Sequence, residues 1–176
     1  MNIRHATTED TLHIFNLVQL YAERGDILPR TQVQIDLTIN DWLVVQINNT
    51  IVGCVSLLKY NQNLAEVRSL IVSDKLQGQG LGAKLLEAII IEAKKRKIPK
   101  LFALTRAQGF FERAGFTLSN REQFPEKIWR DCDQCPVKDN CDEVAVELIL
   151  IRNSDQNQLN NTFRLHKSRE MKETHT

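Results

Sequence analysis

Three glycines between an expected strand and the clearest helical pattern constrain this chain more than any other feature. In LIVSDKLQGQGLGAKLLEAII, Gly78, Gly80 and Gly82 precede apolar positions of helical period that continue toward Lys97. Glycine permits positive φ angles and a close approach of the backbone, so consecutive N–H groups can converge on an anion. The N-terminal end of the following helix adds a partial positive charge. The stretch therefore predicts a pyrophosphate cradle, with a plain glycine-rich connection as the alternative.

Two other phosphate-binding motifs do not match this spacing. A nucleoside-triphosphate loop would end in Gly-Lys followed by Ser or Thr, whereas Ala83 and Lys84 follow Gly82 here. A dinucleotide-binding fold would carry the spacing G-x-G-x-x-G near the start of a βαβ unit. Neither of these nucleotide sites is therefore predicted.

The hydrophobic periodicity of the chain predicts a mixed α/β fold. Strands are expected over 2–5, on both sides of a polar turn at 48–50, and over 65–73, 100–105 and 143–151. Helical patterns are expected over 8–21, 81–97 and 108–115. A second amphipathic stretch opens at Arg30, with Val33, Ile35, Leu37 and Ile39 as its apolar positions. Because the strands come first as a meander and later alternate with helices, we expect one mixed, mostly antiparallel central sheet flanked by helices, of the α/β or α+β class.

Length and charge limit the classes of protein and partner. The 176 residues suggest one domain over 1–152, followed by a polar extension over 153–176. A net charge of +1, without a basic stripe interleaved with aromatics, argues against nucleic acid as a partner. The absence of a long apolar run argues against a membrane partner. The polar start MNIRHATTED does not resemble a secretory signal, so we expect a cytoplasmic chain with reduced thiols.

The glycine stretch and its flanks resemble a known family. Gln77-Gly78-Gln79-Gly80-Leu81-Gly82, with VRSLIV before it and FFERAGF after it, resembles the acetyl-coenzyme-A motif of the Gcn5-related N-acetyltransferase (GNAT) superfamily. The resemblance covers about residues 2–150 and implies transfer of an acetyl group from acetyl-coenzyme A to an amine. It implies that the N–H groups of 77–82 hold the pyrophosphate and that the strand around Leu70, Ile71 and Val72 pairs with the pantetheine arm.

Phe111 marks a departure from this family pattern. It stands where many members carry a Tyr that acts as general acid, since FFERAGF replaces a segment like FYEKxGF. We count Phe111 among the coenzyme contacts and expect solvent or another group to supply the proton. A backbone N–H near Leu70 could meet the oxyanion.

Acyl transfer to a protonated amine requires a base, and a carboxylate can serve directly or through water. Glu66 lies on the strand that leads into the glycine stretch, and it is the candidate base, with a salt-bridged strand residue as the alternative. Strand alternation predicts one face shared by Glu66, Arg68, Leu70 and Val72, and an opposite face with Val67 and Ile71.

A narrower resemblance concerns the acceptor. AEVRSLIV, KLFALT, GFFERAGF and FPEKIWRDCDQCPVKDNCDEVAVEL together resemble the short form of the N-acetylglutamate synthase family, which lacks an amino-acid-kinase domain. This resemblance implies acetylation of the α-amine of L-glutamate by direct attack in a ternary complex, which is the first step of arginine biosynthesis. Glutamine, as the acceptor of some short-form relatives, is the alternative that the resemblance leaves open. A homodimer is expected by resemblance alone.

Glutamate carries two carboxylates, which guanidinium and ammonium groups can bind. The resemblance points to Arg30, Lys127 and Arg130, while Arg68 and Thr105 are further candidates from their strand positions. Two other functions stay open: acetylation of another small amine or a protein N-terminus, and a non-catalytic acyl-coenzyme-A sensor.

The cysteine cluster Cys132, Cys135 and Cys141 follows these cations directly. Reduced structural thiols are the favoured interpretation. Zinc is a less favoured one because a fourth ligand is missing nearby, and a disulfide is the least favoured. Trp129 is expected to be a packing anchor under the acceptor pocket.

Overall fold

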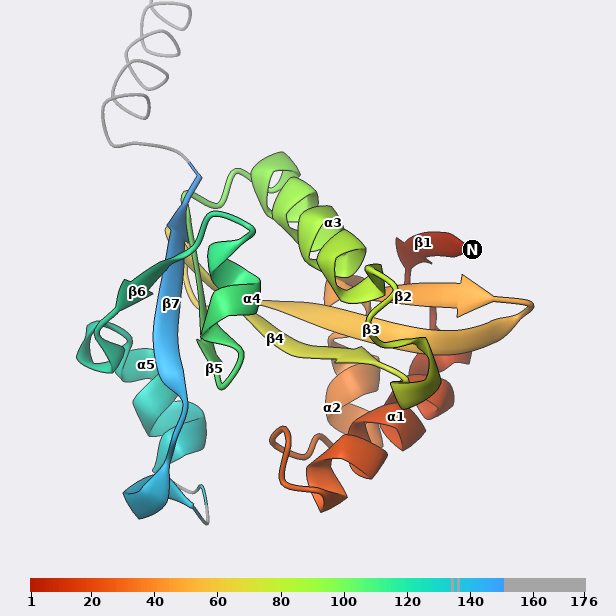
Figure 1. Ribbon diagram of the computed structural model, residues 1–176, viewed down its shortest axis with the longest axis horizontal. Helices are drawn as coiled ribbons and strands as arrows, with labels where there is room; N and C mark the ends of the chain where they lie inside the picture. The colour runs from red at the N-terminus through yellow and green to blue at the C-terminus, as the bar shows by residue number, and fades with distance from the viewer. Residues whose placement is uncertain (134, 136, 151–176) are drawn as a thin grey trace, which may run out of the picture.

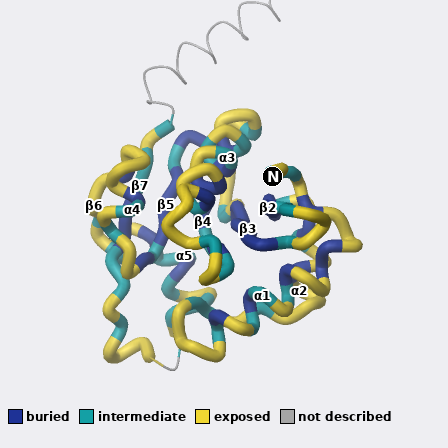
Figure 2. The backbone as a smooth tube through the Cα atoms, turned by 45° about the vertical axis from the view of Figure 1, so that its right-hand side comes forward, coloured by how far each residue is buried: buried dark blue, intermediate teal, exposed yellow. Residues whose placement is uncertain are grey.

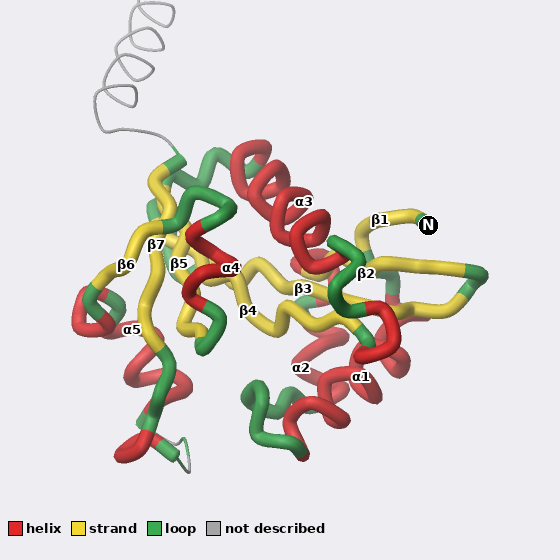
Figure 3. Tube along the Cα trace, viewed as in Figure 1, coloured by secondary structure: helices red, strands yellow, loops and turns green. Residues whose placement is uncertain are grey.

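The computed structural model describes residues 1–133, 135 and 137–150, so the expected extension 153–176 lies outside the described residues. Over that range, helices cover both faces of a seven-stranded sheet (Figure 1; Figure 3). The strands are β1 (Asn2–His5), β2 (Trp42–Ile47), β3 (Thr50–Lys59), β4 (Leu64–Val72), β5 (Lys100–Thr105), β6 (Thr117–Ser119) and β7 (Val144–Ile149). The helices are α1 (Thr11–Glu23), α2 (Gln32–Leu37), α3 (Leu81–Lys95), α4 (Gln108–Glu112) and α5 (Pro125–Lys127), the last continued by the π-helical turn η5 (Ile128–Cys132).

The sheet order is β1-β2-β3-β4-β5-β7-β6, and the pair β4–β5 is parallel while the other neighbours are antiparallel. This confirms the predicted mixed, mostly antiparallel sheet. The turn between β2 and β3 consists of Asn48 and Asn49, with φ angles of 48° and 62°, as a tight hairpin requires. The short strand β6 was not predicted, because three residues carry too little periodicity.

The strands β4 and β5 pair only at one end. Their register runs from Leu64 opposite Lys100 to Glu66 opposite Phe102, and beyond these residues the two strands are not paired. Figure 1 shows the two strands diverging toward the side where the turn before α3 lies. The divergence opens the sheet in its middle.

A bulge in β4 lies just beyond the last paired residue. Ser56 of β3 is opposite Arg68, while Cys54 is opposite Ile71, so β4 contains one extra residue in this interval. Ser69 has a φ angle of +52°, which is unusual for a residue with a side chain.

Because of the bulge, the side chains of β4 do not all lie on the faces that the sequence predicts. Val72 packs with Val67 in the cluster under α3, whereas Ile71 packs with the residues under α1. The expected face with Glu66, Arg68, Leu70 and Val72 is therefore wrong beyond Arg68. Simple alternation of side chains failed because the extra residue reverses it.

Two apolar layers hold the helices against the sheet. Leu85, Leu86 and Ile89 of α3 are buried on one face, and Ile14 and Val18 of α1 are buried on the other. Figure 2 shows the buried positions concentrated along β3 and the exposed ones on the outer sides of the helices. No helix in the described part of the chain is both long and apolar enough to cross a bilayer.

The pattern of α2 differs from the prediction. Ile35 and Ile39 are buried, whereas Val33 and Leu37 are exposed, because a helix turns about 100° per residue and every second residue changes face.

Candidate active site

A cleft of about 1060 Å³ occupies the opening between β4 and β5. Its walls come from the diverging halves of these strands, from the turn before α3, from α3 itself and from α4. The predicted residues that line it are Arg68, Leu70, Ile71, Val72, Gln77, Gly78, Gly80, Leu81, Gly82, Thr105 and Phe111. Gln79 belongs to the same turn but is not among the lining residues of the described chain.

The turn before α3 has the backbone geometry of an anion cradle. Gly78 and Gly80 have φ angles of +75° and +78°, and Gly80 is the N-cap of the helix. The first N–H groups of a helix have no partner within it, so they are free to donate to a ligand at this end. These observations fit the predicted pyrophosphate site.

The side chain of Gln77 supports this turn. Its Nε2 atom donates to the carbonyl oxygen of Val72 over 2.9 Å. The hydroxyl of Tyr21 lies 2.8 Å from the same oxygen and 2.8 Å from Oδ1 of Asp74, which anchors the end of β4 to α1. The first residue of the motif therefore shapes the cradle through its side chain.

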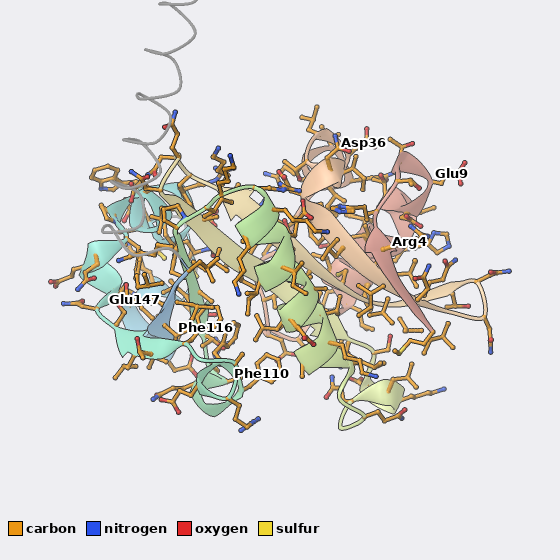
Figure 4. The ribbon with its side chains drawn as sticks, turned by 90° about the horizontal axis from the view of Figure 1, so that it is seen from above. Arg4, Glu9, Asp36, Phe110, Phe116 and Glu147 are labelled. Atoms are coloured by element: carbon orange, nitrogen blue, oxygen red, sulfur yellow. The ribbon has the colours of Figure 1, made fainter. Side chains whose placement is uncertain are left out.

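The α4 wall is aromatic. Phe110 lies beside α3, where a Cβ atom at Gly82 would be 3.5 Å from its ring (Figure 4). Phe111 is buried and meets Phe110 and Phe116 edge to face, with centroids 5.4 and 5.2 Å apart. Leu70, Ile71 and Val72 lie on the part of β4 that does not pair with β5, and such a free edge can pair with the amides of a linear ligand.

A buried chain of charges lies beside the cleft, on the face of the sheet that carries α1 and α5. Lys127 Nζ lies 2.7 Å from Glu66 Oε1 and 2.7 Å from Asp131 Oδ2. Asp131 Oδ2 is also 3.1 Å from Nη2 of Arg30. The hydroxyl of Tyr60 donates to the other oxygen of Glu66 over 2.9 Å. The structure thus brings together the predicted residues Glu66, Arg30 and Lys127.

The ion pairs outweigh the effect of burial on these groups. Burial would lower the pKa of Lys127, but Glu66 and Asp131 raise it above its usual value. Burial would raise the pKa of Asp131, but Lys127 and Arg30 hold it at about 2. Burial and the nearby Glu66 raise the pKa of Tyr60. At neutral pH, Lys127 and Asp131 are charged and the Tyr60 hydroxyl is neutral.

Three buried side-chain atoms lack a protein partner in the described part of the chain: Arg30 Nε, Ser56 Oγ and Arg68 Nε. Ser56 and Arg68 are opposite each other in β3 and β4. Burial, and next the charge of Arg30, lowers the pKa of Arg68, so the two guanidinium groups interact electrostatically. Arg68 lines the cleft. Arg30 and Ser56 are not among the described residues that line the cleft, so of these three residues it is Arg68 that presents a guanidinium group to it.

Of the remaining predicted acceptor residues, Arg130 lies beside this cluster and Thr105 lines the cleft. The guanidinium carbon of Arg130 is 5.9 Å from the centroid of the Tyr60 ring. Thr105 is buried at the end of β5, where its Oγ1 accepts from the N–H of Ala107 over 2.9 Å. Trp129 is 70% exposed, so the expected packing anchor is wrong. Phe124 takes that place, because it is buried and stacks on Phe102 with centroids 4.2 Å apart.

Sequence reasoning missed Tyr60, Ser56 and Asp131. Ser56 lies in β3 and Tyr60 directly follows this strand, in a run that reads as ordinary β structure. Only the pairing of β3 with β4 brings the two residues to the site. The pairing of Asp131 with Lys127 could have been predicted from the sequence. Asp131 follows Lys127 by four residues, so the two side chains can face each other across one helical turn.

The three cysteines of the cluster are free, and each is partly buried. Burial raises the pKa of the Cys132 thiol, against the effect of Lys127 and Arg121. Within residues 1–133, 135 and 137–150, no three His, Cys, Asp or Glu side chains are grouped so as to hold a metal.

This geometry agrees with comparisons to known proteins. Residues 11–116 match the model of the Acetyltransferase (GNAT) family. An uncharacterized N-acetyltransferase of Chlorobaculum tepidum is 35% identical over 144 residues, which cover 82% of this chain and 93% of that protein. The chain therefore belongs to the GNAT family of acetyltransferases. It is an acetyltransferase, and its co-substrate is acetyl-coenzyme A, which the cradle, the free strand edge and the cleft fit.

Several relatives are more specific. The amino-acid acetyltransferase of Escherichia coli is 29% identical over 126 residues, which cover 70% of this chain and 28% of that protein. The structure of N-acetylglutamate synthase from Neisseria gonorrhoeae, complexed with coenzyme A and N-acetyl-glutamate, superposes with a TM-score of 0.75 at 27% identity. It covers 86% of this chain and 35% of that chain. Rv2747 from Mycobacterium tuberculosis, in complex with CoA, superposes with a TM-score of 0.73 at 27% identity over 86% of this chain and 100% of that one. The chain thus spans about a third of the length of the named synthase and about the full length of Rv2747.

Proposed function

We propose that this acetyltransferase acts on the α-amine of an amino acid, with L-glutamate as the acceptor. The observation that carries the proposal is the set of unpartnered donors Arg30 Nε, Ser56 Oγ and Arg68 Nε. Buried donors almost always have partners, because an unsatisfied one costs free energy. A carboxylate can accept from two guanidinium groups and a hydroxyl at once. The Neisseria synthase, with its bound N-acetyl-glutamate, supports glutamate as the acceptor.

The proposed reaction is a direct transfer. The α-ammonium group loses a proton, and the amine nitrogen then forms a bond to the thioester carbon. The N–H of Leu70, just after the bulge, is proposed to donate to the oxyanion. The C–S bond then breaks as the carbonyl reforms, and the nitrogen gives up its second proton to solvent to become the neutral amide. The leaving thiolate takes a proton from solvent, since Phe111 has no hydroxyl. No cysteine is among the described residues that line the cleft, which supports direct attack over a cysteinyl intermediate.

We propose Glu66 as the base that receives the amine proton. Tyr60 and Lys127 each hold one of its oxygens. A carboxylate oxygen can accept more than one hydrogen bond, so an intervening water can still deliver the proton. In this scheme Lys127 and Asp131 orient Glu66 and Arg30, while Arg130 and Thr105 border the acceptor.

The experiment is an assay of thiol release from acetyl-coenzyme A with glutamate, glutamine, other amino acids and a short peptide as acceptors. We expect acceptor-dependent release with glutamate, and initial-rate lines that intersect as a ternary complex requires. Release with the peptide or another amine, but not with an α-amino acid, would contradict the proposal. Parallel initial-rate lines would instead point to a covalent acetyl-enzyme.

With glutamate as the acceptor, the product is N-acetylglutamate, and we propose a cytoplasmic role in arginine biosynthesis. We also propose a homodimer, as the family resemblance implies. Light scattering of the purified chain measures its mass, and a monomer over the micromolar range would contradict the dimer.

A further inference from the structure

The buried charges beside the cleft do not balance. Three cations, Arg30, Arg68 and Lys127, face the two carboxylates of Glu66 and Asp131. Lys127 is held between both carboxylates, and Asp131 also bridges to Arg30. Arg68 has Nε without a partner and lines the cleft. One positive charge is therefore not balanced by a carboxylate of the protein and can attract an anionic ligand. Arg130, beside the Tyr60 ring, adds a further positive charge nearby.

We propose that Asp131 is a specificity-determining residue that weakens the binding of a second acceptor carboxylate and so narrows the preference for glutamate over glutamine. This inference rests on the proposed function. The α-carboxylate of the acceptor takes up the unbalanced charge. A second carboxylate, on the side chain of the acceptor, then lies near cations whose charge Asp131 has already neutralised. It is also repelled by the negative charge of Asp131 itself.

The position of Asp131 favours this role over a purely structural one. Its carboxylate is nearly buried, so its field is weakly screened by solvent. It contacts Arg30, whose Nε is an unpartnered donor in the same guanidinium group. The negative charge of the Asp131 carboxylate therefore acts directly on the Arg30 guanidinium group, which is proposed to bind the acceptor.

The test compares kcat/KM for glutamate and for glutamine in the wild-type protein and in Asp131→Asn. The ratio of the glutamate value to the glutamine value should rise about tenfold, because one buried negative charge is removed. In the double variant Asp131→Asn with Arg30→Gln, the ratio should return toward the wild-type value, since both charges of that pair are gone. Asp133→Asn, at an exposed position in the same segment, is the matched control and should leave the ratio unchanged.

Coenzyme binding and the unfolding temperature are measured for each variant. An unchanged ratio in folded Asp131→Asn overturns the inference, and so does equal loss of activity toward both acceptors with coenzyme binding intact. Should Asp131→Asn fail to fold, Lys127→Gln supplies the test, because removal of a cation should lower the ratio by a similar factor. A wild-type protein that acetylates neither amino acid contradicts the proposed function instead.

Discussion

Ser56 of β3 and Arg68 of β4 are opposite each other in the sheet, and each has a buried polar atom without a partner in the described part of the chain. The pair lies directly before the bulge at Ser69, where β4 turns away from β5. The proposed acceptor pocket thus lies in the sheet at the point where its regular pairing ends.

Arg68→Gln should raise the KM for the amino-acid acceptor between tenfold and a hundredfold, because a hydrogen bond to a charged group contributes about 1.5–3 kcal/mol. The KM for acetyl-coenzyme A should change little. Initial rates with each substrate varied in turn measure both constants. Lys59→Gln, at an exposed end of β3, is the control. Equal increases in both KM values would show that Arg68 supports the whole cleft rather than the acceptor.

Gly80→Ala should weaken coenzyme binding. The positive φ of +78° at this N-cap costs about 1 kcal/mol with a side chain, and relief of that strain moves the N–H groups of the cradle. Gly115→Ala is a matched control, because its φ of +91° imposes similar strain outside the cradle. Both variants should be less stable on thermal unfolding, but only Gly80→Ala should raise the KM for acetyl-coenzyme A. The same effect at Gly115 would remove the argument for a cradle.

Glu66→Gln should lower kcat and change the pH dependence of kcat/KM, because an amide cannot take up the amine proton. Rates with saturating acetyl-coenzyme A over pH 5–10 measure the profile, with about neutral pH as the reference. Glu147→Gln is the control, since Glu147 is also paired with a lysine, Lys100, at 3.0 Å on the neighbouring part of the sheet. A lower kcat with an unchanged profile would assign Glu66 to the positioning of Lys127 instead.

Asp10→Asn should destabilise the fold at neutral pH by about 2 kcal/mol, because Asp10 receives charge-assisted bonds from Arg4 and accepts from the backbone N–H of Thr7 in the capping box of the short turn (Thr8–Asp10) before α1. The Arg4 guanidinium holds the pKa of Asp10 at about 2, below its unfolded value. This stabilisation is therefore full above about pH 4 and is lost as the pH falls toward 2.

Urea unfolding of wild type and Asp10→Asn at several pH values measures this difference. It should shrink as the wild-type carboxylate becomes protonated. Glu9→Gln, the exposed neighbour labelled with Arg4 in Figure 4, should behave like wild type throughout. A pH-independent difference would mean that the effect does not come from the charge of Asp10.

The residues proposed for the coenzyme side could be grouped from the sequence because their signals are local. The glycines at 78, 80 and 82, the helix after them and the aromatic α4 all lie within one stretch, and the cleft brings them together as expected. The acceptor side depends on contacts between distant segments. The approach of Arg30 to Asp131 spans about a hundred residues, and the place of Ser56 depends on strand register.

The bulge at Ser69 explains why the alternation of β4 misled the prediction. A run such as AEVRSLIV contains no glycine or proline to mark an irregularity, so period-two alternation was the natural expectation. The exposure of Trp129 has a related cause. Apolar character alone does not say which side of a short π-helical turn faces the core, and here Phe124 fills the space.

The divergence of β4 and β5 separates the residues proposed to bind the coenzyme from those proposed to bind the acceptor. The proposed coenzyme side is formed mainly by residues 70–116, whereas the proposed acceptor side draws on position 30 and on residues 56–68 and 124–131. Substitutions that alter the choice of acceptor can therefore accumulate in the second set while the first stays constant. A library confined to the acceptor set would explore new amines on an unchanged donor site.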